Sequence, residues 1–499
     1  MILEIARRAA LAVALVGWLP IADTAAQKTV AVAVAGFPDS LRTGFSSFTA
    51  LTLSIQTNDP LLIRENGGKL VPGLATRWEA VDATTWRFTL RGGVKFHDGK
   101  PFTAEDVKFT LDRALDPKTV YGTASRISQI AAVVVIDPLT VEIKTKAAAP
   151  TLLVGLSEIV IEPKHYYEQA GADAVARRPV GTGPFVFQRW VAADRYELTA
   201  NSEYWGGKPR IDRVVFRQIP ESATRISSLL AGETHIVEEI PIDLVERVRA
   251  ARNVEIAAVE TSGSLVLTSD TRKPPFNDPR LRLALDLAID KDLINQQILG
   301  GTGSLLDGQL VTRSTFGHNP ELKPRAYDPE RAKKLLAEAG FPQGFSTVIA
   351  TRSGRYVSDI EIANAIVGML DKIGVKATIN LVEGGVWTRM ATAADMGPLH
   401  LVGWYSLGDA DFNTVWFTEG GKRAFWKNEE YERLFVEARS TVDPAARLKA
   451  YHRMMEIMNA ENPAVFLFGL PSVYGKSKRL TGFAAPEDRL IRLDKADLN

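Results

Sequence analysis

Residues 345–382 constrain the fold of this chain more than any other segment. Residues 345–351 have the composition of a strand, and residues 356–373 place isoleucine and leucine on one side of a helix that ends at Gly374. Residues 375–381 then alternate apolar and polar side chains, as a half-buried strand does. This strand–helix–strand succession is typical of a crossover in a mostly parallel sheet, so the segment predicts an α/β fold.

A second α/β signal lies earlier in the chain. Residues 214–219 predict a strand, and the helix expected after it carries Ile226, Leu229 and Leu230 and ends at Gly232. Two α/β regions separated in the sequence predict two lobes. Clefts between lobes are common ligand sites.

Several helix starts and one β segment can be placed from local signals. Asp278, Asp328 and Asp443 each precede a proline, which predicts an N-cap followed by proline at the first helical position. Residues 85–96 alternate with an interruption at two glycines, which predicts a hairpin or a bulged strand. Thr103 then resembles the N-cap of a further helix.

The N-terminus has the pattern of a secretory signal peptide over residues 1–26. Arg7 and Arg8 precede an apolar stretch at residues 9–19, and small residues at 24–26 offer a cleavage site. The apolar stretch has about half of the ~20 residues that a membrane-spanning helix needs, although an uncleaved anchor is the alternative. The pattern predicts an exported protein that is periplasmic where the cell has a periplasm.

Composition excludes several classes of function. Lys plus Arg number 60 and Asp plus Glu number 59, which does not support a nucleic-acid binder or a polybasic membrane-surface protein. The chain has no Cys, which removes disulfides, thiolate zinc ligands and lipid attachment through cysteine. Its 6 His show no pair at helical ligand spacing. We therefore expect no bound metal and no cofactor.

Motifs of the common enzyme classes do not occur in the sequence. There is no G-x-S-x-G elbow, and residues 93–100 have the wrong length and ending for a phosphate loop. Glu238 and Glu239 are adjacent and are expected to point in different directions, unlike an acid–base couple. These features favour a binding protein over an enzyme.

One long motif carries a family resemblance. Residues 72–75 and Trp78, followed by TWRFTLRGGVKFHDGKPFTAEDV at 85–107, resemble the signature of extracellular solute-binding proteins of the peptide/nickel type. These proteins are the capture subunits of ABC importers. Further segments similar to the family are 179–185, 201–209, 276–294, 327–340 and Gly403-Trp404. The resemblance covers essentially the whole chain after residue 26.

The resemblance implies an α/β, two-lobe periplasmic-binding-protein fold of type II, in the large class with an extra subdomain and a hinge between the lobes. The implied parts are lobe I from 27–57, 178–262 and 471–499, an inserted subdomain at 58–177, and lobe II at 263–470. The lobes would close on a peptide or other small solute, since contacts made by both lobes favour the closed state. The expected partner is an ABC permease at the cytoplasmic membrane, with the binding protein itself a monomer.

The resemblance also implies where the ligand is held. The residues expected at the site are Gly403, Trp404, Tyr405, Asp409, Asp411, Trp387, Tyr121, Arg126 and Phe45. Trp404 and Tyr405 would supply flat contact area, and Gly403 would let a ligand approach the backbone. Arg126 would hold a carboxylate through two bonds. The alternatives are core packing for Trp404 and a surface position for Arg126.

One position departs from the peptide-binding relatives. These relatives carry, three residues after the tryptophan, an aspartate that pairs with the ligand's α-ammonium group, and Leu407 stands there in this chain. Either Asp409 or Asp411 replaces it, or the ligand has no free α-amine, because an unpaired buried ammonium is costly. Turn formation is the alternative role of both aspartates. A peptide-like ligand is the first hypothesis. A modified amino acid or opine, a sugar derivative and a metal chelate remain open as ligands, and an exported hydrolase and a chaperone are the alternative classes of function.

Overall fold

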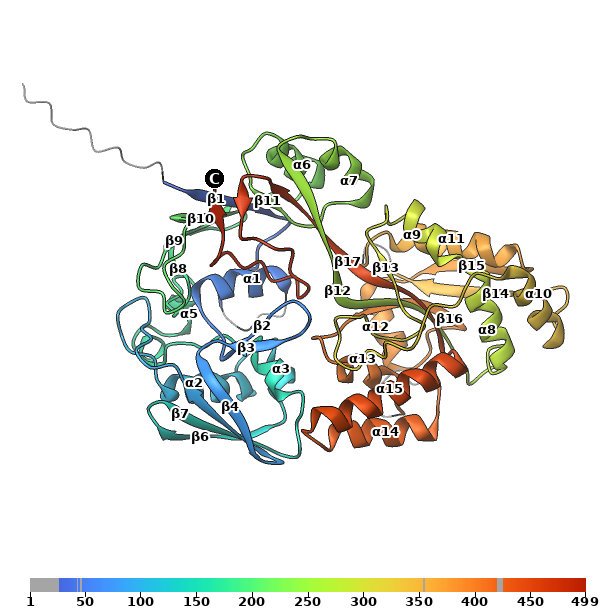
Figure 1. Cartoon of the computed structure of the whole chain (residues 1–499), viewed down its shortest axis with the longest axis horizontal. Coiled ribbons are helices and arrows are strands. Elements are labelled where there is room, and N and C mark those ends of the chain that lie inside the picture. Colours follow the sequence, from blue (N-terminus) through green and yellow to red (C-terminus); the bar gives the residue numbers. More distant parts are fainter. Residues whose placement is uncertain (1–26, 43, 45–46, 353–354, 420–424) are drawn as a thin grey trace, which may run out of the picture.

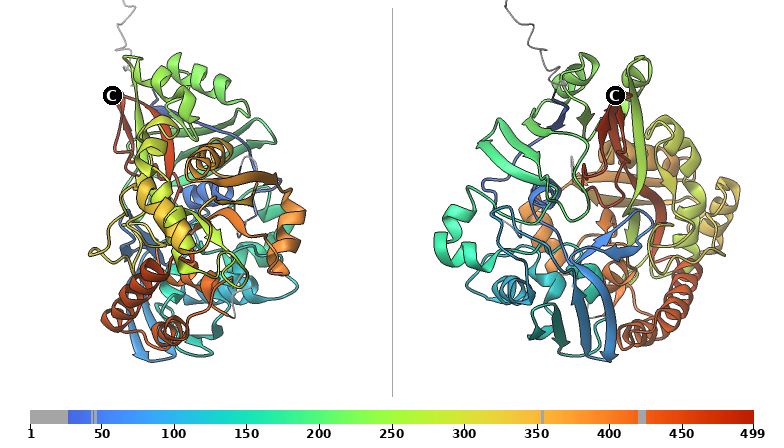
Figure 2. Two further views of the ribbon diagram at one scale, coloured as in Figure 1. Left: turned by 90° about the vertical axis from the view of Figure 1, so that its right-hand side faces the viewer. Right: turned by 60° about the vertical axis from the view of Figure 1, so that its left-hand side comes forward.

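Two long antiparallel strands connect the two halves of the molecule. A computed structural model describes residues 27–42, 44, 47–352, 355–419 and 425–499. Strands β12 (Val254–Ser269) and β17 (Ala464–Ser477) run side by side between a left and a right body in Figure 1 and in the right-hand view of Figure 2. Residues 254–260 pair with 471–477, and residues 264–268 pair with 464–469. The left body is called lobe I and the right body lobe II.

Lobe I continues the sheet outward from β17 through β11 (Ile236–Val237), β1 (Thr29–Val34), β10 (Arg213–Gln218), β9 (Arg195–Ala200) and β8 (Phe185–Val191). β1 pairs parallel with β10 and β11, whereas β8, β9 and β10 are antiparallel. Helices α6 (Ser222–Leu230) and α7 (Ile242–Arg249) pack on this sheet, as does α1 (Phe48–Thr57). The predicted strand and helix before Gly232 are confirmed as β10 and α6.

A second sheet belongs to lobe I and lies at the lower left of Figure 1, with the order β4-β5-β7-β6. Its strands are β4 (Ala75–Asp82), β5 (Thr85–Leu90), β6 (Ile130–Asp137) and β7 (Thr140–Thr145). The other elements here are β2 (Leu62–Arg64), β3 (Leu70–Pro72), α2 (Ala104–Leu115), the 3-10 helix η1 (Ala124–Ile127), α3 (Leu152–Leu156), α4 (Lys164–Ala170) and α5 (Ala172–Val175).

The β segment predicted over residues 85–96 is shorter in the structure. The strand ends at Leu90, and Gly93 adopts a φ of +76°, so the chain turns instead of continuing the strand. Phe96 is nevertheless buried in the same core as Phe88. Thr103 caps α2 as predicted, because its backbone N–H donates to the Asp106 carboxylate at 2.9 Å.

Lobe II continues the large sheet in the order β15-β14-β16-β12-β17. Its strands and helices are β13 (Ser304–Leu305), β14 (Phe345–Thr351), β15 (Val375–Leu381), β16 (Leu399–Tyr405), α8 (Pro279–Ala288), α9 (Lys291–Gln297), α10 (Pro329–Glu338), α11 (Asp359–Asp371), α12 (Gly384–Thr392), α13 (Asp411–Thr414), η2 (Val415–Phe417), α14 (Glu429–Arg439) and α15 (Pro444–Glu461). The C-terminal strands β18 (Leu480–Thr481) and β19 (Asp497–Leu498) pair with each other.

The crossover predicted over residues 345–382 is confirmed, since β14 and β15 are parallel and α11 lies between them in sequence. All three Asp-Pro starts are confirmed, with each aspartate accepting an N–H of its helix's first turn. The expectation of a mostly parallel sheet was wrong. Strand β12 is antiparallel to both β16 and β17, which come from distant parts of the chain.

Side-chain alternation along the strands of lobe II creates two apolar cores. Leu265 and Leu401 point to the face covered by α8–α11, and Val266 and Val402 point to the face covered by α12–α15. Both faces are therefore buried. Among the described residues, no helix has the length and apolar character required to span a bilayer.

Candidate functional site

The two lobes meet at aromatic side chains close to the connecting strands. Tyr405 ends β16 in lobe II, and Phe48 begins α1 in lobe I. Their ring centroids are 5.7 Å apart with an edge-to-face angle of 70°. Gly263, where the pairing of β12 with β17 is interrupted, leaves room for this tyrosine, because a Cβ there would lie 2.7 Å from the Tyr405 ring.

The predicted site residues Gly403 and Trp404 of strand β16 face opposite sides of the sheet. The Gly403 carbonyl accepts a hydrogen bond from the Tyr356 hydroxyl at 2.7 Å. A Cβ on Gly403 would lie 2.9 Å from the backbone oxygen of Ser264, so the close approach requires glycine. Trp404 points to the other face, is 8% exposed and packs against Phe417 at 5.7 Å. The structure thus gives Trp404 a packing role, and its ligand contact stays a prediction.

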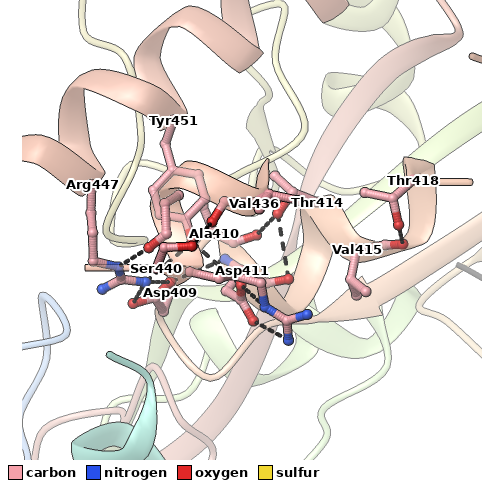
Figure 3. A network of polar contacts seen from close by, with 12 residues as sticks. Asp409, Ala410, Asp411, Thr414, Val415, Thr418, Val436, Ser440, Arg447 and Tyr451 are labelled. Atoms are coloured by element: carbon pink, nitrogen blue, oxygen red, sulfur yellow. Dashed lines mark hydrogen bonds and ion pairs between the residues drawn. The ribbon is translucent and has the colours of Figure 1, made fainter. Parts of the chain in front are cut away.

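Asp409 and Asp411 are held inside lobe II by arginines (Figure 3). Both carboxylate oxygens of Asp409 accept bonds from Arg447 of α15, at 2.9 and 3.0 Å. Asp411 pairs with Arg439 of α14 at 2.8 Å. Burial raises the pKa of the Asp409 carboxyl even beside Arg447. These pairs favour a structural role for both aspartates, and neither carboxylate is left free to replace the one absent at Leu407.

Two other predicted site residues have packing partners, and a third cannot be placed. Trp387, on α12, is 4% exposed and belongs to the same core as Trp404. Tyr121 is buried in the core beside the second sheet, where its ring lies against Gly44. Phe45 lies outside the described residues.

Arg126 belongs to a small charged cluster. Its guanidinium contacts Glu158, which also accepts a bond from Arg64 at 3.3 Å. Burial and the charge of Arg64 lower the pKa of Arg126 to about 10. Arg64 in turn lines a crevice with Ser314 and Gly408 of lobe II. Arg64 and Arg126 share this one carboxylate, and Glu65, Glu487 and Asp488 line the same crevice, so carboxylate binding by Arg126 stays a prediction.

A charged pair that the sequence did not reveal lies at the same junction. Arg489 contacts the carboxylate of Glu239, and its guanidinium lies 4.3 Å from the ring centre of Phe48 and 5.5 Å from that of Tyr405. Both residues of the pair have a left-handed backbone conformation, with φ of +55° for Glu239 and +64° for Arg489. Residues other than glycine rarely adopt this conformation, and such residues cluster at functional sites.

Glu238 and Glu239 do point in different directions, as the sequence predicted. Glu238 is half-buried and accepts the N–H of Ala35 at 3.1 Å, whereas the Glu239 side chain is 50% exposed. Burial and the neighbouring Glu239 raise the pKa of the Glu238 carboxyl from 4.5 to about 7, although Arg489 and Arg225 oppose the shift. The folded protein therefore keeps this proton at pH values where the unfolded chain has lost it.

This pKa predicts how Glu238→Gln changes stability with pH. Between about pH 4.5 and 7, proton binding by Glu238 favours the folded state, and its contribution is lost as the pH rises. The variant's free energy of unfolding should therefore increase relative to wild type between about pH 4.5 and 7, as measured by urea denaturation. Glu246→Gln, on the surface of α7, controls for the loss of one charge. A difference independent of pH would contradict the assignment.

No group of His, Asp and Glu in the described ranges could hold a metal ion. The arrangement at the junction is instead suited to binding an organic solute, with aromatic rings from both lobes and charged groups of both signs. The fold and this junction define a two-lobed periplasmic-binding-protein architecture.

Comparisons with known proteins agree with this architecture. Residues 69–423 match the family model of bacterial extracellular solute-binding proteins, family 5. The glutathione-binding protein GsiB of Salmonella typhimurium is 30% identical over 435 residues, 84% of each chain. The chain belongs to family 5 of the bacterial extracellular solute-binding proteins, as its motifs predicted.

Solved structures show the same fold. HbpA2 from Haemophilus parasuis has a TM-score of 0.86 at 26% identity, covering 94% of this chain and 100% of that one. DppA from Helicobacter pylori, in complex with the peptide STSA, has a TM-score of 0.74 at 26% identity, covering 94% and 98%. AgaA from A. tumefaciens R10, in complex with agropinic acid, has a TM-score of 0.73 at 26% identity, covering 94% and 99%.

Proposed function

We propose that this protein is exported with a signal peptide that is cleaved after residue 26. The protein captures a peptide-like solute between its lobes as a monomer and delivers the solute unchanged to an ABC permease. The observation that carries the proposal is the junction where Phe48 and Arg489 of lobe I meet Tyr405 of lobe II. A ligand held there would contact both lobes, and such contacts favour closure.

The pairing of the connecting strands supports a hinge between the lobes. The register of β12 on β17 shifts between Glu260 and Ser264, where the sheet passes from one lobe to the other. We place the boundaries of lobe I at 27–57, 178–262 and 471–499, with the inserted part at 58–177 and lobe II at 263–470. The three solved structures HbpA2, DppA and AgaA are each 26% identical to this chain. The TM-score is nevertheless 0.86 to HbpA2 and 0.73–0.74 to the two ligand complexes. This difference supports a lobe arrangement unlike that of the ligand-bound relatives.

Glutathione is the first candidate ligand. The match to GsiB spans 84% of the chain, and GsiB is a glutathione-binding protein. The absence of an aspartate at Leu407 argues against recognition of an ordinary peptide amine by lobe II, since Asp409 and Asp411 are occupied. The likeness to AgaA with agropinic acid keeps a modified amino acid as the second candidate.

Calorimetry and small-angle scattering test the proposal together. Residues 27–499 should bind one equivalent of glutathione or of another solute from an amino acid, opine and peptide panel, with a smaller radius of gyration when bound. At a ligand concentration 100 times Kd the folded state gains about 2.7 kcal/mol, so the melting temperature rises. Mass spectrometry should recover the solute intact. A product would indicate the hydrolase alternative, and a profile unchanged by every solute would refute the proposal.

A further inference from the structure

We infer that Glu239 and Arg489 together bind the α-amino acid head of the ligand, with Glu239 receiving the ammonium group and Arg489 the carboxylate. The inference rests on the proposed function and names the class of solute. This class consists of molecules that carry an α-ammonium and an α-carboxylate on one carbon and extend through the side chain, as a γ-glutamyl peptide does.

The first argument is that lobe II offers no free carboxylate in the segment where peptide-binding relatives have one. Leu407 is apolar, and the carboxylates of Asp409 and Asp411 are paired with Arg447 and Arg439 and only 4% exposed. Glu239 is a carboxylate at the lobe junction whose side chain is 50% exposed. Arg489 is its one partner among the described residues, so an oxygen remains available to an ammonium group.

The second argument is the rigidity of Arg489. Its turn is fixed by Asp488, which accepts the N–H of Leu490 at 3.0 Å and bonds to Arg492 at 2.7 and 3.0 Å. The Ile491 carbonyl accepts a bond from Gln56 of α1 at 2.7 Å. The guanidinium is therefore positioned before a ligand arrives, and four of its five N–H donors have no partner in the described part of the chain.

The third argument is distance. Glu239 and Arg489 are in direct contact, so the two ligand charges that they bind must be close together. In a linear peptide the ammonium and carboxylate are at opposite ends, separated by up to about 3.5 Å for each residue. In an amino acid head both groups are on one carbon. The Tyr405 ring of lobe II lies 5.5 Å from the Arg489 guanidinium, so closure would exclude water from this side of the pair.

Chemically matched ligands and variants test the inference by calorimetry. The probes are glutathione, glutaryl-cysteinylglycine without the ammonium group, and γ-aminobutyryl-cysteinylglycine without the α-carboxylate. Each truncated probe should bind wild type about 10- to 100-fold more weakly than glutathione. Glu239→Gln should weaken glutathione binding by a similar factor and leave glutaryl-cysteinylglycine unchanged. Arg489→Met should weaken glutathione and leave γ-aminobutyryl-cysteinylglycine unchanged.

Glu246→Gln removes a lobe I carboxylate that pairs with Arg249 on the surface of α7, and it should bind all three probes as wild type does. Circular dichroism confirms that each variant is folded. Equal losses for all probes in Glu239→Gln would overturn the inference. If wild type binds other solutes of the panel but none with an amino acid head, the inference fails and the proposed function stands. If it binds no solute, both fail.

Discussion

Replacing Arg447 with methionine should lower the free energy of unfolding by about 3–5 kcal/mol. The substitution removes the cation that pairs with Asp409, and both side chains are nearly inaccessible, at 6% and 4% exposure. Asp409 would remain buried without a counter-charge and beside the negative charge of Asp411. Urea denaturation measures the loss.

The matched control lies on the same helix. Arg453 pairs with Glu430 at 2.8 Å, but the two side chains are 49% and 38% exposed. Arg453→Met should therefore change stability by less than about 1 kcal/mol, because exposed ion pairs contribute little. Combining Arg447→Met with Asp409→Asn should restore part of the loss, since no buried charge then remains unpaired. Equal losses of stability in Arg447→Met and Arg453→Met would show that burial does not increase the contribution of the Arg447–Asp409 pair.

Replacing Gly181 with alanine should destabilise the protein by about 1–3 kcal/mol or more through overpacking. This glycine belongs to the family-like segment 179–185, and a Cβ there would lie 2.1 Å from the Thr57 carbonyl oxygen and 2.5 Å from the Asn58 side chain. The backbone at the end of α1 cannot give way easily, because Asn58 N–H bonds to the Ser54 carbonyl at 2.9 Å. Thermal and urea unfolding measure the change.

Replacing Gly368 with alanine should have the opposite effect on stability. It lies within α11, and a Cβ there would meet no atom within 4 Å. Gly368→Ala should stabilise the protein by about 0.5–1 kcal/mol, because alanine loses less conformational entropy in a helix. If both alanine variants shifted stability in the same direction, the close approach of Gly181 to α1 would not be what requires glycine.

Much of the local structure could be predicted from adjacent residues. The bounds of β14 and β15 agree with residues 345–351 and 375–381. The helix between them was predicted three residues too long at its start and two at its end. Asp359 accepts the N–H groups of Arg355 and Tyr356, so the helix begins only at that aspartate. Side-chain capping of this kind is hard to distinguish from helix continuation in sequence.

The candidate site was predicted less completely. Tyr405 lies at the lobe junction, where its ligand contact stays a prediction, and the alternation of β16 turns Trp404 into the core of lobe II. Asp409 and Asp411 lie two residues apart, and nothing in the sequence indicates that Arg447 and Arg439 on later helices would neutralise them. The expected signal peptide at residues 1–26 lies outside the described residues and stays a prediction.

The sequence by itself determined the succession of helices and strands, the caps that start them and the family, because each depends on residues near one another or on a long motif. Only the tertiary structure decided which charges meet. Glu239 and Arg489 are 250 residues apart, and they touch because the C-terminal segment returns across α1 beside the end of β11. Such contacts depend on the packing of segments that are distant in sequence, so local sequence patterns do not indicate them.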